Sequence, residues 1–202
     1  IVAYGAAVLR KVAKDIDSSY PDLSKFIDDM WETMYASNGV GLAAPQVNKD
    51  IRVFVVDSLQ IVENFDEEDK ADYPNEKGIK KVFINAHIKD LDGDEWPYNE
   101  GCLSIPKIRE DVYRPETVTI SYLNEKFELQ KASFSGITAR VIQHEYDHLE
   151  GKLFIDYIKP LRKKLLQSKG CTSGIVNVSG DINTWGKQLD GKPWTVGIVN
   201  PM

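Results

Sequence analysis

The chain has 202 residues, 42% of them hydrophobic and 28% charged, values typical of a soluble globular protein with one domain. Its 31 acidic and 25 basic residues leave a net charge of −6, which argues against a protein that coats DNA. Two cysteines, Cys102 and Cys171, are too few for a disulfide scaffold and favour a reducing compartment.

No run of about 18 apolar residues is present, so we expect no membrane span. The charges Arg10 and Lys11 follow the apolar opening segment, whereas a secretory signal has its charges in front. These features together predict a cytoplasmic protein.

The clearest predicted helix spans residues 22–36, because its apolar residues recur every three or four positions and form one stripe. Asp22 is its expected N-cap residue, and Asn38-Gly39 is its expected stop. A Gly-rich segment, residues 39–46, follows directly. We expect this helix to pack its apolar stripe against a core.

Residues 57–80 have the composition of a surface insertion. Seven acids and one base stand within residues 63–76. A charge run of this kind usually belongs to a solvated face, so we expect a solvated loop.

A second helix is expected from about Ser135 to Glu150, with Gly151 as its C-cap residue. Pro160 is expected to open a short basic helix over residues 160–168. The composition then changes abruptly towards Gly, Asn, Thr and Trp. Short strands are expected at residues 51–56, 82–85, 118–122 and 127–130.

The strongest chemical signal is an HExxH pattern, formed by His144, Glu145 and His148 on the second predicted helix. Residues four apart lie on one helix face, so both imidazoles can reach one metal ion. Neutral imidazole binds a borderline divalent cation well, and Glu145 can accept a proton from water that the cation acidifies. The pattern therefore predicts a catalytic metal site.

Such a site needs a third protein ligand. No Glu follows Glu150, and Phe154 stands where metzincin-like peptidases have a histidine, so both usual peptidase endings are missing. His87 is a possible ligand, although a histidine near a strand end is more often exposed or satisfied. Cys102, within the segment Glu100–Ser104, is a better candidate because thiolate binds Fe(II) or Zn(II) strongly. From composition alone, a buried inert cysteine is equally acceptable.

Three segments together resemble the three signature motifs of the peptide deformylases: Gly39–Gln46 (GVGLAAPQ), Glu100–Ser104 (EGCLS) and Gln143–Gly151 (QHEYDHLEG). Their order and rough spacing also match, and the resemblance covers about residues 1–168. It implies an α+β fold in which antiparallel sheets wrap around the central helix that carries HExxH. It also implies a hydrolase that removes formyl from the N-terminal formyl-methionine of newly made polypeptides and releases formate.

By this resemblance, Cys102, His144 and His148 would be the metal ligands, with the fourth position left to water. Glu145 would act first as general base and then as general acid. Fe(II) would be the usual ion, with Zn(II) or Ni(II) also able to occupy the site.

The resemblance further implies that the Gln46 amide and the Leu103 backbone N–H would stabilise the oxyanion, and that the Gly41 backbone would help to dock the peptide. Arg140 stands where an apolar wall residue is often found. The remaining substrate-binding positions implied are Val40, Tyr98, Arg109, Ile137 and Val141.

The tail does not resemble a deformylase. From Gly174 to Pro201 it resembles a segment of the bacterial flavin transferases that attach FMN to proteins, without a complete site. We therefore expect a catalytic domain at residues 1–168 and an atypical tail at 169–202 that forms an appendage. The basic run within 159–169 is either a solvated helix face or a contact for ribosomal RNA.

Two other functions stay open from the residues alone. The first is a zincin-like endopeptidase, against which the missing downstream ligands speak. The second is a structural zinc site without catalysis, closed by Cys102, Cys171, His144 and His148.

Overall fold

The structure is a computed structural model that describes residues 1–158, 172–178, 181–188 and 191–192. It divides into two compact units, Ile1–Phe154 and Ile155–Met202. The expected helix at 160–168, the basic run and Cys171 lie outside the described residues.

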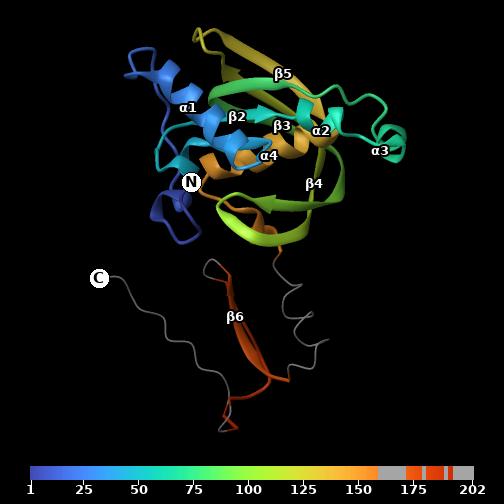
Figure 1. Cartoon of the computed structure of the whole chain (residues 1–202). Helices are drawn as coiled ribbons and strands as arrows, with labels where there is room; N and C mark the ends of the chain where they lie inside the picture. The colour runs from blue at the N-terminus through green and yellow to red at the C-terminus, as the bar shows by residue number, and fades with distance from the viewer. Residues whose placement is uncertain (159–171, 179–180, 189–190, 193–202) are drawn as a thin grey trace. The chain divides into compact units, whose positions relative to one another are not determined.

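The elements follow one another along the chain as shown in Figure 1. Helices of the 3₁₀ type carry the label η. Their bounds are η1 (Ala7–Arg10), α1 (Leu23–Ala36), β1 (Gly41–Ala43), η2 (Ala44–Val47), β2 (Val53–Asp57), α2 (Leu59–Glu63), α3 (Glu67–Asp72), β3 (Lys80–Cys102), β4 (Ile105–Leu123), β5 (Leu129–Ser135), α4 (Gly136–Leu149), η3 (Phe154–Tyr157), β6 (Gly174–Val178) and β7 (Asp181–Trp185).

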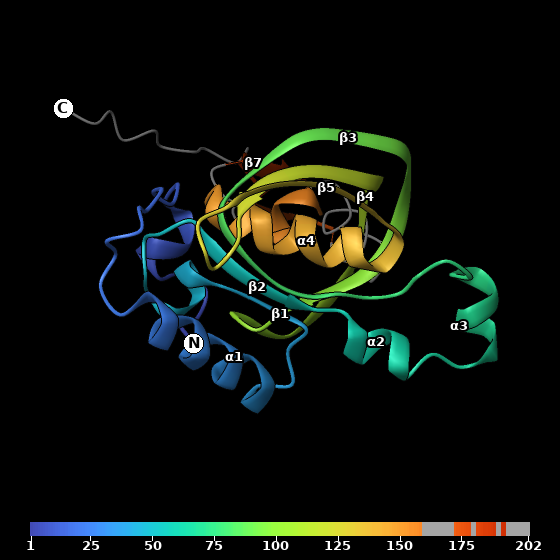
Figure 2. The same cartoon turned by 90° about the horizontal axis from the view of Figure 1, so that it is seen from above.

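The first unit is an α+β structure built on one antiparallel sheet in the order β1-β2-β3-β4-β5. Figure 2 shows the long strands β3 and β4, with β5, curving around one side of α4, while β1 and β2 lie on its other side. The expected fold, an antiparallel sheet around the helix that carries HExxH, is confirmed.

Bulges explain how β3, a strand of 23 residues, can wrap around a helix. Its pairing with β4 shifts register at four places, between Ile84 and His87 and then three more times before Cys102. Each bulge bends its strand and increases the local twist. The sequence predicted only residues 82–85 of this strand, because its exposed middle lacks alternating apolar residues.

Two apolar cores lie on opposite faces of β2. Phe54 and Val56 face the inner core with α4, whereas Val53 and Val55 face the outer core with α1. Both faces of the strand are therefore buried, which explains an apolar run without alternation. In the inner core the Phe83 ring lies 4.6 Å from that of Phe54 and 4.4 Å from that of Tyr122.

The two long helices were predicted almost to the residue. Asp22 occupies the N-cap position of α1, but its φ of 52° is left-handed and its side chain makes no capping bond. Its carbonyl instead accepts from Phe26 N–H at 2.9 Å. Gly151 ends the α4 region with a φ of 68°, and a Cβ there would lie 2.8 Å from the Arg10 carbonyl carbon. Only glycine fits this turn without strain.

The acidic stretch within residues 57–80 is solvated, as expected, but the expected loop is wrong because the segment contains α2 and α3. Asp66 caps α3 by accepting from the backbone N–H groups of Glu68 and Asp69, both at 2.9 Å. Ile61 on α2 packs against the inner core. Glu67, Glu68 and Asp72 of α3 are exposed. These acids dominate the composition of the segment, so the sequence showed no sign of the short apolar helix α2 before them.

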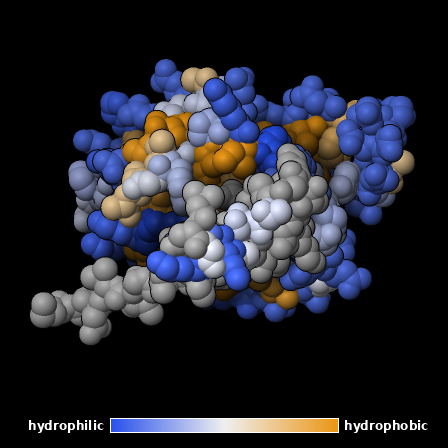
Figure 3. All heavy atoms as spheres, turned by 90° about the horizontal axis from the view of Figure 1, so that it is seen from below, coloured by the Kyte–Doolittle hydropathy of each residue, from blue (hydrophilic) through white to orange (hydrophobic). Residues whose placement is uncertain are grey.

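The last strand of the sheet is also displaced from its expected place at 127–130. Phe127 has a φ of 58° and belongs to the turn that joins β4 to β5, so β5 begins at Leu129. In the second unit, β6 and β7 form an antiparallel hairpin. None of the described helices is long and apolar enough to cross a membrane. Figure 3 shows apolar patches separated by hydrophilic residues on the face seen from below.

Phe83→Ala should lower the free energy of unfolding by about 3–5 kcal/mol, since it empties the centre of the inner-core aromatic cluster. Urea denaturation measures the change. Leu129→Ala is the control, because Leu129 is 74% exposed, and it should change stability by less than about 0.5 kcal/mol. Equal effects of the two substitutions would contradict this description of the core.

Candidate active site

Three side chains that could hold a metal ion converge between β3 and α4. The ligand atoms of Cys102, His144 and His148 all lie within 4.8 Å of one another. Cys102 Sγ lies 3.4 Å from His148 Nε2. In a tetrahedral site with usual zinc bond lengths, a sulfur and a nitrogen ligand would be about 3.5 Å apart. The sulfur and this nitrogen are therefore spaced as two ligands of one cation would be, and the third donor lies close enough to complete the group.

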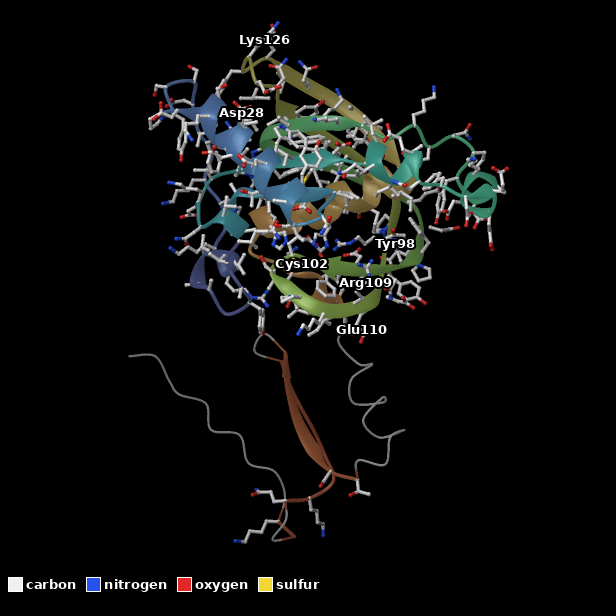
Figure 4. All side chains as sticks on the ribbon, in the orientation of Figure 1. Asp28, Tyr98, Cys102, Arg109, Glu110 and Lys126 are labelled. Carbon is white, nitrogen blue, oxygen red and sulfur yellow. The ribbon has the colours of Figure 1, made fainter. Side chains whose placement is uncertain are left out.

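The structure thus decides between the two candidates for the third member of this group. Cys102 lies at the end of β3 beside α4, as Figure 4 shows. His87 lies elsewhere on the same strand, where its 44% exposed side chain has Nε2 3.5 Å from Asp15 Oδ1. Cys102 is accordingly part of a cluster, and His87 is a surface residue.

A buried carboxylate orients His144. Glu100 Oε2 lies 2.9 Å from His144 Nδ1, which leaves Nε2 as the nitrogen available to a cation. Arg114 donates to both Glu100 oxygens, at 2.7 and 3.0 Å, and to Asp147 at 2.6 Å. Burial alone would raise the pKa of Glu100, but the bonds from His144 and Arg114 outweigh it and lower the pKa to about 2.

Glu145 is buried beside this cluster, and its Oε2 meets no hydrogen-bond partner within the described residues. Burial raises the pKa of Glu145 to about 7, so the carboxyl group can exchange a proton near neutral pH. Gly41 makes room for it, because a Cβ at Gly41 would lie 2.5 Å from Glu145 Oε1. The Glu145 carboxylate of α4 can therefore occupy this position only because residue 41 of β1 has no Cβ.

The amide of Gln46 faces the same place from η2. Its Oε1 accepts from Ala43 N–H at 2.8 Å, which sets the orientation of the amide group. Its Nε2 then lies 3.6 Å from Cys102 Sγ and 3.4 Å from Ser104 Oγ. An N–H donor thus faces the cluster of Cys102, His144 and His148. Leu103, in the turn between β3 and β4, lines a cavity that opens beside this cluster.

A cavity of about 400 Å³ opens beside these groups. Of the expected substrate-binding residues, Val40, Tyr98, Arg109 and Val141 line it. Ile137 is 2% exposed on α4 and is not among the lining residues, so its part in substrate binding stays a prediction. Further lining residues, which the sequence did not suggest, are Ile61, Ile105, Lys107 and Ile108.

Two arginines of the cavity are held in contrasting ways. Arg109 reaches across the β3–β4 hairpin, where its Nη2 donates to the Asn99 carbonyl at 2.6 Å. Arg140 is buried, and its Nη2 donates to the Trp96 carbonyl at 2.6 Å while its Nη1 donates to Glu100 at 3.2 Å. Its Cζ lies 4.4 Å from the centre of the Trp96 ring. The charge of the Arg140 guanidinium is thereby balanced by Glu100, and its face stacks on the Trp96 ring. A charged arginine can therefore form part of an otherwise apolar cavity wall.

Sequence reasoning assigned no role to Glu100 or Arg114. Glu100 is the first residue of the EGCLS segment, so its place in a motif was visible although its contact with His144 was not. Arg114 carried no signal, because it stands in a strand among exposed neighbours and reaches Glu100 only across the hairpin.

Comparison with known proteins decides the family. A family model described as Polypeptide deformylase matches residues 1–164. This chain belongs to the polypeptide deformylase family. A second model, described as ApbE family, matches residues 157–202 and gives the flavin-transferase resemblance of the tail marginal support.

Named relatives agree with this family. The peptide deformylase of Flavobacterium johnsoniae is 54% identical over 170 residues, which cover 84% of this chain and 86% of that protein. A crystal structure of a peptide deformylase from Synechococcus elongatus in complex with actinonin is 38% identical, with a TM-score of 0.67, and the match covers 84% of this chain and 86% of that one. A Met-Ala-Ser-bound class I type b peptide deformylase from Acinetobacter baumannii is 33% identical, with a TM-score of 0.67 and coverage of 78% and 96%.

The protein is therefore a metal-dependent hydrolase that removes formyl from the N-terminal formyl-methionine of newly made polypeptides and releases formate. Membership of this family also overturns the zincin-like endopeptidase that the HExxH pattern alone left open.

Gly41→Ala should lower kcat about 100-fold, because the new Cβ would displace the Glu145 carboxylate from the site. Formate release measures kcat, while metal content and the urea unfolding midpoint should stay close to those of the unchanged protein. Native turnover in this variant would show that the position of Glu145 beside Gly41 does not matter for the reaction.

Proposed function

We propose that Cys102, His144 and His148 bind the catalytic cation and that Glu145 transfers the proton. The carrying observation is the convergence of three donor atoms within 4.8 Å beside a buried carboxylate that has an unpartnered oxygen. A thiolate with two imidazoles suits Fe(II) and Zn(II) alike. We propose Fe(II) as the native ion on the family resemblance, with Zn(II) or Ni(II) as functional substitutes.

When bound, the cation would acidify a water molecule and polarise the formyl carbonyl group. Glu145 accepts the proton of the attacking water and passes it to the departing amine, which a carboxyl group of pKa about 7 can do. The Nε2 of Gln46 and the backbone N–H of Leu103 donate to the oxygen on which negative charge develops. The Gly41 backbone docks the peptide and leaves room for Glu145.

We propose that the apolar side chains of Val40, Tyr98 and Val141 receive the methionine side chain and that Arg109 lies along the substrate backbone. The cavity places them beside the metal-ligand cluster, as this role requires. The Met-Ala-Ser bound by the deformylase of Acinetobacter baumannii supports a peptide that begins with methionine. The substrates would then be N-formyl-methionyl nascent peptides in the cytoplasm.

The remaining proposals concern the C-terminal part. We assign residues 1–168 to catalysis and treat 169–202 as an appendage, and the ApbE family match over 157–202 supports a flavin-transferase origin for it. A contact with ribosomal RNA is proposed on charge alone. The residues concerned are Lys159, Arg162, Lys163, Lys164 and Lys169.

The roles of base and ligand can be separated with two variants purified without oxygen. Glu145→Ala should keep its metal and lose at least about 100-fold in kcat for formate release from formyl-Met-Ala. Cys102→Ala should lose metal during dialysis, because two imidazoles alone bind the ion more weakly. Metal analysis and the formate assay give both results. An active Glu145→Ala enzyme would refute the assigned base.

The alternative of a closed structural zinc site makes an opposite prediction for Cys171. Under our proposal, Cys171→Ser keeps metal and activity, and so does a chain without residues 170–202. Under the structural alternative, both changes release the metal because one of four ligands is gone. Metal content and formate release decide between the two, and an inactive truncated chain with normal metal would instead give the tail a part in catalysis.

A further inference from the structure

The acidic segment 57–80 contributes a side chain to the substrate cavity. Ile61 on α2 lines the cavity and packs against the inner core together with Val40. Val141, a buried member of that core, lines the cavity as well. An apolar wall therefore forms from three separate parts of the chain, and one of them is the segment that the sequence suggested to be a solvated loop.

Two side chains attach this segment to the first turn of α4. Glu76 accepts from the Thr138 hydroxyl at 2.7 Å through Oε1 and from the Thr138 backbone N–H at 3.2 Å through Oε2. Ser58 Oγ lies 2.7 Å from Thr138 Oγ1 and accepts from Ile79 N–H at 2.9 Å. Both ends of the segment are thus bonded to the helix that carries His144.

Glu76 takes over a task that normally belongs to the residue in front of a helix. Ser135 stands at the N-cap position of α4 but makes no side-chain capping bond. The N–H of the third helical residue, Thr138, is bonded by Glu76 instead, 62 residues earlier in the chain. A carboxylate at this end also suits the helix dipole.

A third contact joins the segment to the peptide-docking strand. Gln60 Nε2 donates to the Gly39 carbonyl at 3.3 Å and to the Asp57 carbonyl at 3.4 Å. Gly39 leads directly into Val40 and Gly41, which line the cavity. The orientation of α2 is therefore coupled to both sides of the substrate site.

We propose that Ile61 is a specificity-determining residue that closes the slot for the first side chain of the substrate, and that Glu76 is the positioning residue that holds it there. The inference rests on the proposed function, since it places the substrate's first side chain among Val40, Val141 and Ile61. The side chain of Ile61 limits the size of that slot, so its removal should admit larger residues.

The test compares kcat/KM for formate release from formyl-Phe-Ala and formyl-Met-Ala in the metal-loaded enzyme. Ile61→Ala should raise the ratio of the phenylalanine to the methionine substrate at least fivefold, and Ile61→Phe should lower it at least fivefold. Leu59→Ala is the matched control on the same helix, because Leu59 does not line the cavity, and it should stay within twofold. A ratio that is the same in Ile61→Ala and Leu59→Ala overturns the proposal.

The positioning role of Glu76 has its own readout. Glu76→Ala should shift the substrate ratio in the direction of Ile61→Ala, whereas Glu76→Gln keeps an acceptor for Thr138 N–H and should stay within twofold of the unchanged enzyme. If Glu76→Ala leaves the ratio unchanged while Ile61→Ala shifts it, the positioning role is wrong. If the unchanged, metal-loaded enzyme releases no formate from formyl-Met-Ala, the proposed function itself is refuted.

Discussion

The bond between Glu100 and His144 joins the end of β3 to α4, and the arrangement of the site depends on it. Glu100 and Cys102 are two residues apart on the same strand, so the carboxylate that orients one imidazole also fixes the distance of the thiol from the helix. The end of β3 thereby supplies both Cys102, which we propose as a metal ligand, and the carboxylate that orients His144. Bulges in β3 bend the strand far enough around α4 to make this contact possible.

The buried carboxylate of Glu100 stays ionised in this position because two arginine side chains donate to it. Arg114 and Arg140 both donate to Glu100, and Arg114 also bonds Asp147 on α4. A buried ion pair contributes little net stability, but removing one partner leaves an uncompensated charge and is strongly destabilising. The main effect of these ion pairs is therefore to hold Glu100, and through it His144, in a fixed position. The ion pairing also accounts for a cationic Arg140 at a wall position where an apolar residue is often found.

Sequence reasoning succeeded where the signal is local. Apolar spacing located α1 to within a residue, and the expected span of the second helix, from about Ser135 to Glu150, matches α4. The HExxH pattern placed two imidazoles on one face of that helix. It failed where the decisive contact is distant. Residues 57–80 are rich in acid, yet Glu76 bonds Thr138 and Ile61 reaches the cavity. Ile137 lies on the same helix as His144 but is not among the residues that line the cavity, and a position on that helix does not say which side chains face the cavity.

The sequence by itself determined the types of donor, their order along the chain and the family to which they belong, because short motifs retain the residues that the chemistry needs. The resemblance had already grouped Cys102 with His144 and His148. Only the tertiary structure showed that His87 lies apart from them on the surface and that Glu100 and Arg114 stand behind them. The physical reason is that bulges and packing against α4 determine which residues of β3 and β4 pair across the bent hairpin. Neither bulges nor this packing produces a periodic pattern in the amino-acid sequence.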